Sequence, residues 1–300
     1  MSAHSRSGHG HGSGHHNTDI DWGAMATRLE NSGELQLPVL RQTAARLREL
    51  LGPDKEVRRI LDIGSGPGVM TCVLAEAFPE ARTVAVDGAA ALLDRATARA
   101  ERLGLGARVT THHAELPEGL DEDLGTADLI WSSRAVHHLG DQQGALDGLA
   151  GALRPGGLLA IAEGGLPTRF LPRDIGIGRP GLQARLDAAL EDWFAAMRAE
   201  LPGSTSVVED WPALLTRAGL APAGTFSLLL DLPAPLDGPA RTYLHAELSR
   251  LRESMGEPFD AEDRTTVDQL LDAEAPEGIL RRPDAFLLSA TTVFTGMRRA

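Results

Sequence analysis

Cysteine and long apolar runs are nearly absent from this chain of 300 residues. Its single cysteine, Cys72, cannot form an intramolecular disulfide. The start of the chain has no apolar stretch of the kind that a signal peptide needs, so we expect a reducing, cytoplasmic environment. No uncharged run approaches the roughly 18 to 20 apolar residues that cross a bilayer, which argues against a membrane protein.

Positive charge is also scarce. The 29 Lys and Arg residues face 42 Asp and Glu residues, and the formal net charge is −13. Binding to a nucleic-acid backbone needs a cationic surface that releases counterions, so nucleic acid is an improbable partner for this chain. We therefore expect a small organic substrate. We also expect the protein to be a monomer or a homodimer.

Residues 1–18 form a tail rich in His, Gly and Ser that offers nothing to bury, and we expect it to be disordered. Five of the ten histidines lie here: His4, His9, His11, His15 and His16. One interpretation is a metal-binding tail. Because the spacing is irregular and no Cys or carboxylate accompanies it, we favour a flexible leader or a remnant of cloning, and predict no metal site.

The pattern of apolar residues then predicts an α/β domain. In residues 19–56, apolar residues at helical spacing on either side of Pro38 predict two helices. Residues 57–163 alternate short apolar strands with helices, which predicts a parallel sheet covered on both faces. The expected strands are 59–63, 83–86, 108–113, 128–132 and 158–162, and the expected helices are 69–78, 89–103 and 142–153.

The remaining residues, 164–300, depart from this alternation. We expect strands at 224–230 and 286–295 and helices at 181–201, 211–218, 239–255 and 260–271. Two largely helical stretches, about 164–205 and 231–283, are interpreted as insertions at one end of the sheet.

The strongest chemical signal is the run Asp62-Ile63-Gly64-Ser65-Gly66-Pro67-Gly68, where a strand passes through a glycine turn into a helix. Glycines let the backbone approach a ligand, and the helix N-terminus offers free N–H groups. A dinucleotide fold would have its third glycine at Val69, whereas this chain has it at Gly68. The spacing argues against a nicotinamide oxidoreductase.

The sequence resembles the class I S-adenosylmethionine-dependent methyltransferases. The glycine run is similar to the first motif of that family, and four further motifs follow in the family's order between residues 58 and 163. These are Val84-Ala85-Val86-Asp87-Gly88, His113-Ala114-Glu115-Leu116-Pro117, Ala127 to Ser133 with Ala135-Val136-His137-His138-Leu139, and Leu153-Arg154-Pro155-Gly156-Gly157-Leu158.

The resemblance implies a Rossmann-like sheet of seven strands, six of them parallel and the last antiparallel, with helices on both faces. It also implies S-adenosylmethionine as cofactor and S-adenosylhomocysteine as product, bound at the switch point between strands one and four. The residues expected at the cofactor are Asp62, Gly64, Ser65, Gly66, Gly68, Asp87, Gly88, Ala114, Glu115 and Ser132.

Within this set the resemblance implies that Asp87 accepts hydrogen bonds from the ribose, and that Glu115 and the backbone of Ala114 meet the adenine amino group. Each acid also has a structural interpretation: Asp87 as a helix cap, Glu115 as a solvated loop acid, and Asp62 as a support for the glycine turn.

Candidates for catalysis follow the fourth strand. A neutral histidine suits proton removal near physiological pH, so His137, and less so His138, is a candidate base, although a structural role is favoured for the pair. Arg134 could orient an acceptor carboxylate or pair with a surface acid.

The acceptor side is expected in the helical insertions, which would form a substrate cap, with the N-terminal helices as a lid over the cofactor. Arg169, Arg173 and Arg179 follow Glu163 in a Pro/Gly-rich segment that we predict to be a loop, and they either bind an anionic group or are solvated. Tyr243, the only tyrosine, is a candidate for the pocket wall.

The predicted function is methyl transfer to a small organic acceptor through O, N or C, in bacterial secondary metabolism, with an indole-containing peptide among the candidates. The alternatives are a non-catalytic S-adenosylmethionine-binding module, a nicotinamide oxidoreductase and a nucleic-acid methyltransferase.

Overall fold

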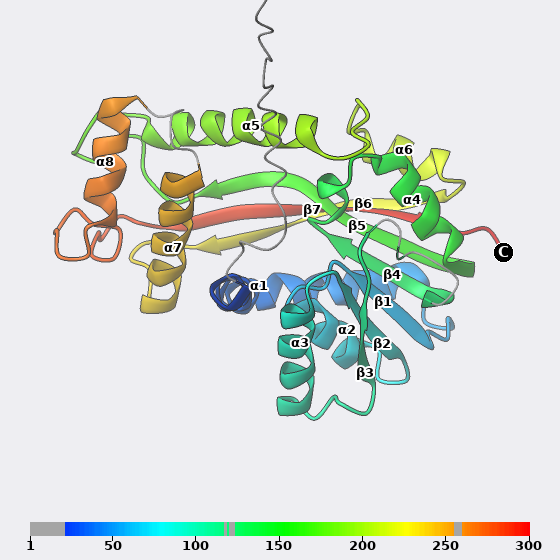
Figure 1. Ribbon diagram of the computed structural model, residues 1–300. Coiled ribbons are helices and arrows are strands. Elements are labelled where there is room, and N and C mark those ends of the chain that lie inside the picture. Colours follow the sequence, from blue (N-terminus) through cyan, green and yellow to red (C-terminus); the bar gives the residue numbers. More distant parts are fainter. Residues whose placement is uncertain (1–21, 117–118, 120–123, 255–259) are drawn as a thin grey trace, which may run out of the picture.

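The computed structural model describes residues 22–116, 119, 124–254 and 260–300, and the predicted tail, 1–18, lies outside them (Figure 1). The strands are β1 (Arg59–Ile63), β2 (Arg82–Asp87), β3 (Val109–His113), β4 (Ala127–Ser133), β5 (Leu153–Arg169), β6 (Ala221–Leu232) and β7 (Leu287–Met297). The helices are α1 (Trp22–Leu51), α2 (Val69–Ala77), α3 (Ala90–Arg102), η2 (Val136–His138), α4 (Gln142–Gly151), α5 (Leu182–Glu200), α6 (Trp211–Arg217), α7 (Gly238–Ser254) and α8 (Ala261–Leu271).

All seven strands belong to one sheet, in the order β3-β2-β1-β4-β5-β7-β6. Strands β1 to β5 pair in parallel, and β7 is antiparallel to both β5 and β6. The predicted arrangement of six parallel strands and one antiparallel strand is confirmed. Because the chain leaves β1 toward β2 and β4 toward β5, the switch point lies between β1 and β4, as expected.

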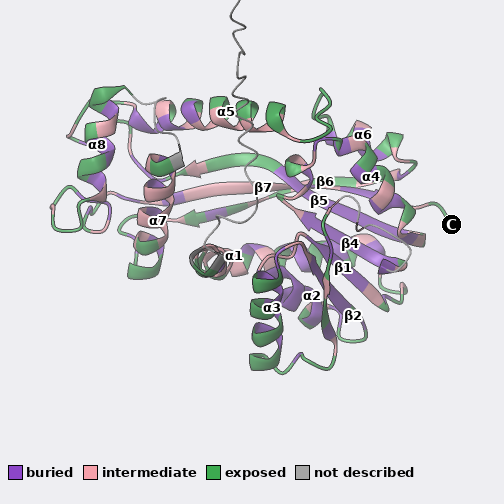
Figure 2. Ribbon diagram, in the orientation of Figure 1, coloured by how far each residue is buried: buried purple, intermediate pink, exposed green. Residues whose placement is uncertain are grey.

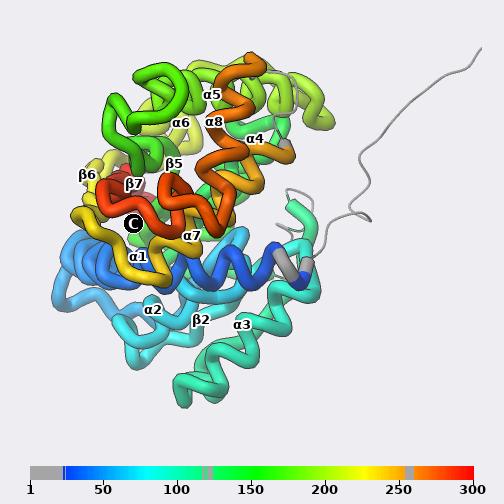
Figure 3. The backbone as a smooth tube through the Cα atoms, turned by 90° about the vertical axis from the view of Figure 1, so that its left-hand side faces the viewer, coloured from blue at the N-terminus to red at the C-terminus, as the bar shows by residue number. Residues whose placement is uncertain are grey.

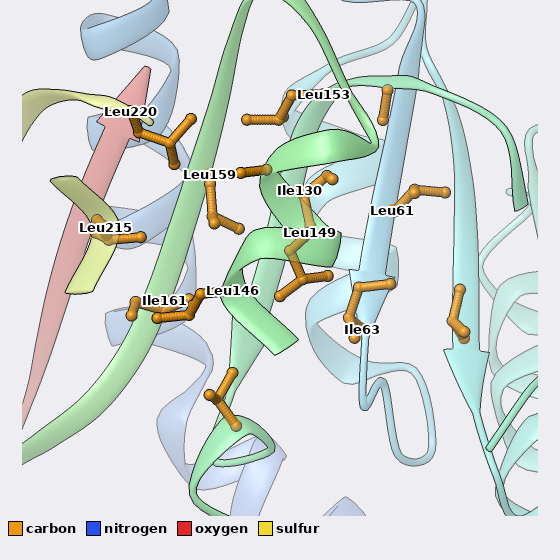
Figure 4. Packing of buried hydrophobic residues seen from close by; sticks show 14 of the residues in the cluster. Leu61, Ile63, Ile130, Leu146, Leu149, Leu153, Leu159, Ile161, Leu215 and Leu220 are labelled. Atoms are coloured by element: carbon orange, nitrogen blue, oxygen red, sulfur yellow. The ribbon is translucent and has the colours of Figure 1, made fainter. Parts of the chain in front are cut away.

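Alternating apolar side chains give the sheet a core on each face. Leu61 and Ile63 of β1 pack with Leu146 of α4 and with α6, and Ile60 packs on the other face with α1 and α2. Figure 4 shows the first of these layers, in which leucines of α4 lie over β1, β4 and β5. The central strands are the most deeply buried part of the chain (Figure 2).

The two predicted N-terminal helices are one continuous helix, α1, with Pro38 inside it. Proline removes one N–H from the helical ladder and leaves the carbonyl of Glu34 without its usual donor. Both residues are exposed, so water can bind that carbonyl. The neighbouring Val39, Ala44 and Leu47 are buried, and their packing holds the helix together across the proline.

The predicted Pro/Gly-rich loop after Glu163 is wrong in its first part, because β5 continues to Arg169 and pairs with β7. The pairing register shifts between Ala162 and Gly165, where the backbone has φ 71° at Gly164 and 116° at Gly165. A Cβ at Gly165 would lie 2.1 Å from the carbonyl oxygen of Ala290. These glycines therefore form a bulge, after which the strand resumes.

The helical insertions form a separate apolar cluster beyond the parallel strands. Helices α5, α7 and α8 bury Leu186, Leu244 and Val267 in it. The cluster also contains Leu230 of β6, Leu287 of β7 and Phe170, which follows β5. No helix within the described ranges is long and apolar enough to cross a membrane.

Candidate active site

The glycine turn between β1 and α2 lies at the switch point. Gly64 and Gly68 have φ of 69° and 75°, in the left-handed region that favours glycine. A Cβ at Gly64 would lie 2.6 Å from the Cβ of Ala135, and one at Gly68 would lie 2.6 Å from the Cβ of Ala96. The turn is therefore packed closely between the loop after β4 and helix α3.

The end of β2 holds this turn in place. The N–H groups of Gly64 and Ser65 donate to the carbonyl oxygen of Val86 at 2.9 and 3.0 Å. Gly66 N–H donates to Oδ2 of Asp87 at 2.9 Å, and Ala89 N–H donates to Oδ1 of the same carboxylate at 2.9 Å. Asp87 thus bonds to the turn and to the start of α3, and each of its oxygens keeps a further lone pair for a ligand.

Glu115 lies against the same corner of the site. Its carboxylate is close to Gly88, where a Cβ would be 2.7 Å from Oε2 of Glu115. The N–H of Ala114 donates to the carbonyl oxygen of Asp87 at 3.1 Å, so this N–H is already used within the sheet. A contact between the Ala114 backbone and adenine is therefore limited to its carbonyl oxygen. Glu115 itself is exposed.

Asp62 and Ser132 lie at the buried base of the turn. Oδ2 of Asp62 accepts the hydroxyl of Thr71 in α2 at 2.5 Å, which matches the supporting role predicted as one of its alternatives. Burial raises the pKa of Asp62 to about 7. Ser132 pairs with Ile63 across the switch point, and its buried hydroxyl has no hydrogen-bond partner in the described part of the chain.

A buried carboxylate orients His137. Oε2 of Glu163 lies 2.6 Å from Nδ1 of His137, and Oε1 of Glu163 accepts the N–H of Val136 at 3.1 Å. Nε2 of His137 lies 3.0 Å from Nε2 of His138. Glu163 has 3% of its side chain exposed and His137 has 17%. The glutamate, the two rings and the end of β4 therefore form one connected group.

Glu163 was not predicted as a site residue, although it begins the predicted insertion. The one sequence signal that could have found it is its position as an acid directly after the buried apolar run 158–162 of β5. Its partner His137 is 26 residues away in the chain, and only the pairing of β4 with β5 brings the two together.

Arg134 lies in the loop after β4, and its charge influences a residue of the helical insertions. It has φ 52°, a left-handed conformation that is uncommon for a residue other than glycine, and its side chain is exposed. Its charge acts on Tyr243 of α7, which is partly buried. Burial raises the pKa of the Tyr243 phenol, and Glu247 raises it further, while Arg134 has the opposite effect.

Helix α1 lies between helices α2 and α3 on one side and helices α5, α7 and α8 of the insertions on the other, as Figure 3 shows. Leu29 is 3.8 Å from the position of a Cβ on Gly66. Arg28 donates from Nη1 to Oε1 of Glu247 in α7 at 2.8 Å, and from Nη2 to Sδ of Met25 at 2.9 Å. These contacts fit the predicted lid, which stays a prediction, and the side chain of Trp22 is not described.

The arginines of the insertion divide into two groups. Arg179 forms ion pairs with Asp260, Glu262 and Asp263, so its interpretation as an anion-binding residue loses support. Arg169 and Arg173 are exposed and have no ion pair among the residues described.

Other predicted features have structural roles. Leu182 and Leu186 of α5 are buried in the apolar cluster of the helical insertions. Cys72 is a free, buried cysteine. A groove of about 730 Å³ between α1 and α2, lined by Arg41, Val73 and Glu76 among others, includes none of the predicted site residues.

The fold and this edge define a Rossmann-like α/β domain of the methyltransferase type. Residues 60–157 match the family described as a methyltransferase domain. The core of this chain is therefore a class I S-adenosylmethionine-dependent methyltransferase domain, and the resemblance identified from its motifs is confirmed. The nicotinamide interpretation has no support.

Curated relatives match mainly through part of their length. The bifunctional biotin biosynthesis protein BioCD of Bordetella avium is 40% identical over 139 residues, which are 46% of this chain and 28% of that protein. The trans-aconitate 2-methyltransferase of Methylobacterium radiotolerans is 31% identical over 173 residues, 53% of this chain and 62% of that protein. The chain thus spans less than two thirds of the length of these relatives.

Solved structures with similar folds include a SAM-dependent methyltransferase from Geobacter sulfurreducens in complex with S-adenosyl-L-homocysteine. It is 21% identical, with a TM-score of 0.49, and the alignment covers 87% of this chain and 90% of that chain.

Proposed function

We propose that this protein transfers a methyl group from S-adenosylmethionine to a small organic acceptor. The observation that carries the proposal is the convergence of the glycine turn, Asp87 and Glu115 at the switch point of a methyltransferase domain. When bound, the cofactor supplies an electrophilic methyl group on a sulfonium. Alignment and exclusion of water are then the main tasks of the protein.

The residues at this edge fit that cofactor. Asp87 retains acceptor lone pairs for a ribose diol. The carboxylate of Glu115 lies against Gly88, the residue after Asp87, where the adenine would follow the ribose. Ser132 offers a buried hydroxyl without a partner in the described chain, and we assign it to the amino-acid end of the cofactor.

The acceptor is proposed to be a small molecule that reacts through O, N or C. The predicted setting in bacterial secondary metabolism, an indole-containing peptide as one candidate, and a cytoplasmic location belong to this proposal. Relatives named trans-aconitate 2-methyltransferases add a tricarboxylate to the candidates. Arg134, exposed beside the turn, would orient a carboxylate in such an acceptor.

Methyl-labelled S-adenosylmethionine tests the proposal. The protein is incubated with catechol, tryptamine, an indole-containing dipeptide and trans-aconitate, and the label is traced by mass spectrometry. We expect label in at least one acceptor with the parent, and at least about tenfold less with Asp87→Ala. Binding of the cofactor without any transfer would favour the non-catalytic module instead.

A further inference from the structure

Three side chains beyond β4 and β5 form a continuous hydrogen-bonded chain. Glu163 contacts Nδ1 of His137 at 2.6 Å, and the two Nε2 atoms of His137 and His138 are 3.0 Å apart. The glutamate is buried and His138 is exposed, so the chain runs from the interior to the surface. It follows the residue Ala135, which packs against the first glycine of the turn.

The positions of the protons follow from the donors and acceptors. An ionised Glu163 only accepts, so His137 must carry its proton on Nδ1. A neutral His137 then has a lone pair on Nε2, and the 3.0 Å contact requires His138 to donate from its own Nε2. The nitrogen left without a proton is Nδ1 of His138.

We propose that His137 and His138 form a two-ring proton relay, oriented by Glu163, that takes the proton of a hydroxyl or amine acceptor at Nδ1 of His138. The proposal rests on the proposed methyl transfer and assigns its acceptor to the class of protic nucleophiles. It also revises the sequence-based preference for His137 as the base, because Nε2 of His137 is engaged by the contact with Nε2 of His138.

The step balances without an oxidant or a further reactant. The acceptor oxygen or nitrogen forms its bond to the methyl carbon, and the electron pair of the broken carbon–sulfur bond stays on sulfur. The acceptor proton moves to Nδ1 of His138, and the proton on Nε2 of His138 moves to Nε2 of His137. The positive charge thus ends on His137, beside the carboxylate of Glu163.

The surrounding charges favour this end point. Partial desolvation of the His138 ring, with the neighbouring His137 adding to it, lowers the pKa of His138 below its ordinary value. Arg198 of α5 donates to the carbonyl oxygens of His137 and Leu139 and also disfavours a charge on His138, whereas Glu163 favours one. Phe194 packs edge-on against His137, with ring centroids 5.3 Å apart. A charge that passes through His138 is therefore best held on His137.

Nitrogen-15 NMR of histidine-labelled full-length protein tests the relay without an acceptor. Signals are assigned with His137→Ala and His138→Ala. At pH 7.5 we expect a proton on Nδ1 of His137 and on Nε2 of His138. On acidification, His138 is expected to stay neutral, because its pKa is lowered, while its proton changes from Nε2 to Nδ1. A doubly protonated His138 appearing first, or no change of tautomer, would overturn the relay.

Variants of the glutamate separate orientation from mere packing. Glu163→Gln removes the charge with little change of shape and should reduce the preference for the Nδ1 tautomer of His137 by about tenfold. Glu200→Gln, an exposed residue of α5, should leave both tautomers unchanged. An unaltered tautomer in Glu163→Gln would contradict the orienting role. The measurement on the parent stands even if this variant does not fold.

Calorimetry with S-adenosylhomocysteine on the same samples distinguishes the two proposals. The parent and His138→Ala should bind it equally, because the relay is assigned to the acceptor. Failure of the parent to bind would overturn the proposed function and leave the proton positions to be judged from the NMR result alone.

Discussion

Asp87 at the end of β2 accepts the N–H of Gly66 in the glycine turn at 2.9 Å, although 21 residues separate the two in sequence. The other oxygen of Asp87 accepts the N–H of Ala89, which precedes α3. One carboxylate therefore fixes the turn and the next helix. A ligand that binds Asp87 meets a turn whose geometry is already set.

Asp87→Asn is expected to weaken both folding and cofactor binding. The free energy of unfolding should fall by about 1.5 to 3 kcal/mol, because a hydrogen bond to a charged acceptor is lost. The affinity for S-adenosylhomocysteine should fall by at least about tenfold. Urea unfolding and calorimetry measure the two effects. Asp94→Asn, on the exposed face of α3, is the control. Reduced stability with unchanged affinity would show that Asp87 is only a cap.

Alanine substitutions at two glycines distinguish the cost of backbone strain from the cost of close packing. Gly64 and Gly104 have φ of 69° and 71°, but a Cβ at Gly104 would meet no atom within 4 Å. Gly104→Ala should cost about 1 to 2 kcal/mol of unfolding free energy from strain alone. Gly64→Ala should cost more, because its Cβ would press on Ala135, and it should also weaken cofactor binding. Equal losses in the two variants would contradict close packing at the turn.

Asp62 is expected to make stability depend on pH. Its pKa is raised to about 7 by burial, so between about pH 4 and 7 the folded protein holds a proton that the unfolded chain releases. The free energy of unfolding of the parent therefore falls as pH rises through this window, because the folded protein must give up this proton. Unfolding of the parent and Asp62→Asn by urea should show the variant gaining about 2 to 3 kcal/mol relative to the parent between pH 5 and 8. Parallel pH curves would rule this out.

The contact between α1 and α7 should stabilise the lid more than a surface ion pair does. Arg28 and Glu247 are 2.8 Å apart with side chains 25% and 20% exposed, whereas Arg46 and Glu49 on α1 are 53% and 64% exposed. Double-mutant cycles with alanine should give a coupling of about 1 kcal/mol for the first pair and less than about 0.5 kcal/mol for the second. A coupling no larger for Arg28 and Glu247 would show that this contact does not stabilise the predicted lid.

Local patterns were sufficient for the glycine turn, for most of the helices and for the strands, apart from the extent of β5. The run from Asp62 to Gly68 combines a buried strand, left-handed glycines and a helix start within a few residues, so short-range chemistry determines its structure. The antiparallel β7 and the switch point between β1 and β4 came instead from the family resemblance.

Long-range contacts could not be predicted in this way. Glu163 contacts His137 only because β4 and β5 pair, and Tyr243 comes near Ser32 only because α7 packs on α1. The continuation of α1 through Pro38 likewise depends on tertiary burial of the residues that follow it. Helix and strand propensity carries no information on these contacts.

Calorimetric titration of the full-length protein with S-adenosylhomocysteine and with NAD tests cofactor recognition most directly. Binding of S-adenosylhomocysteine in the micromolar range, with no heat of binding from NAD, is the expected result. Binding of NAD together with no response to S-adenosylhomocysteine or S-adenosylmethionine would contradict the assignment of this site.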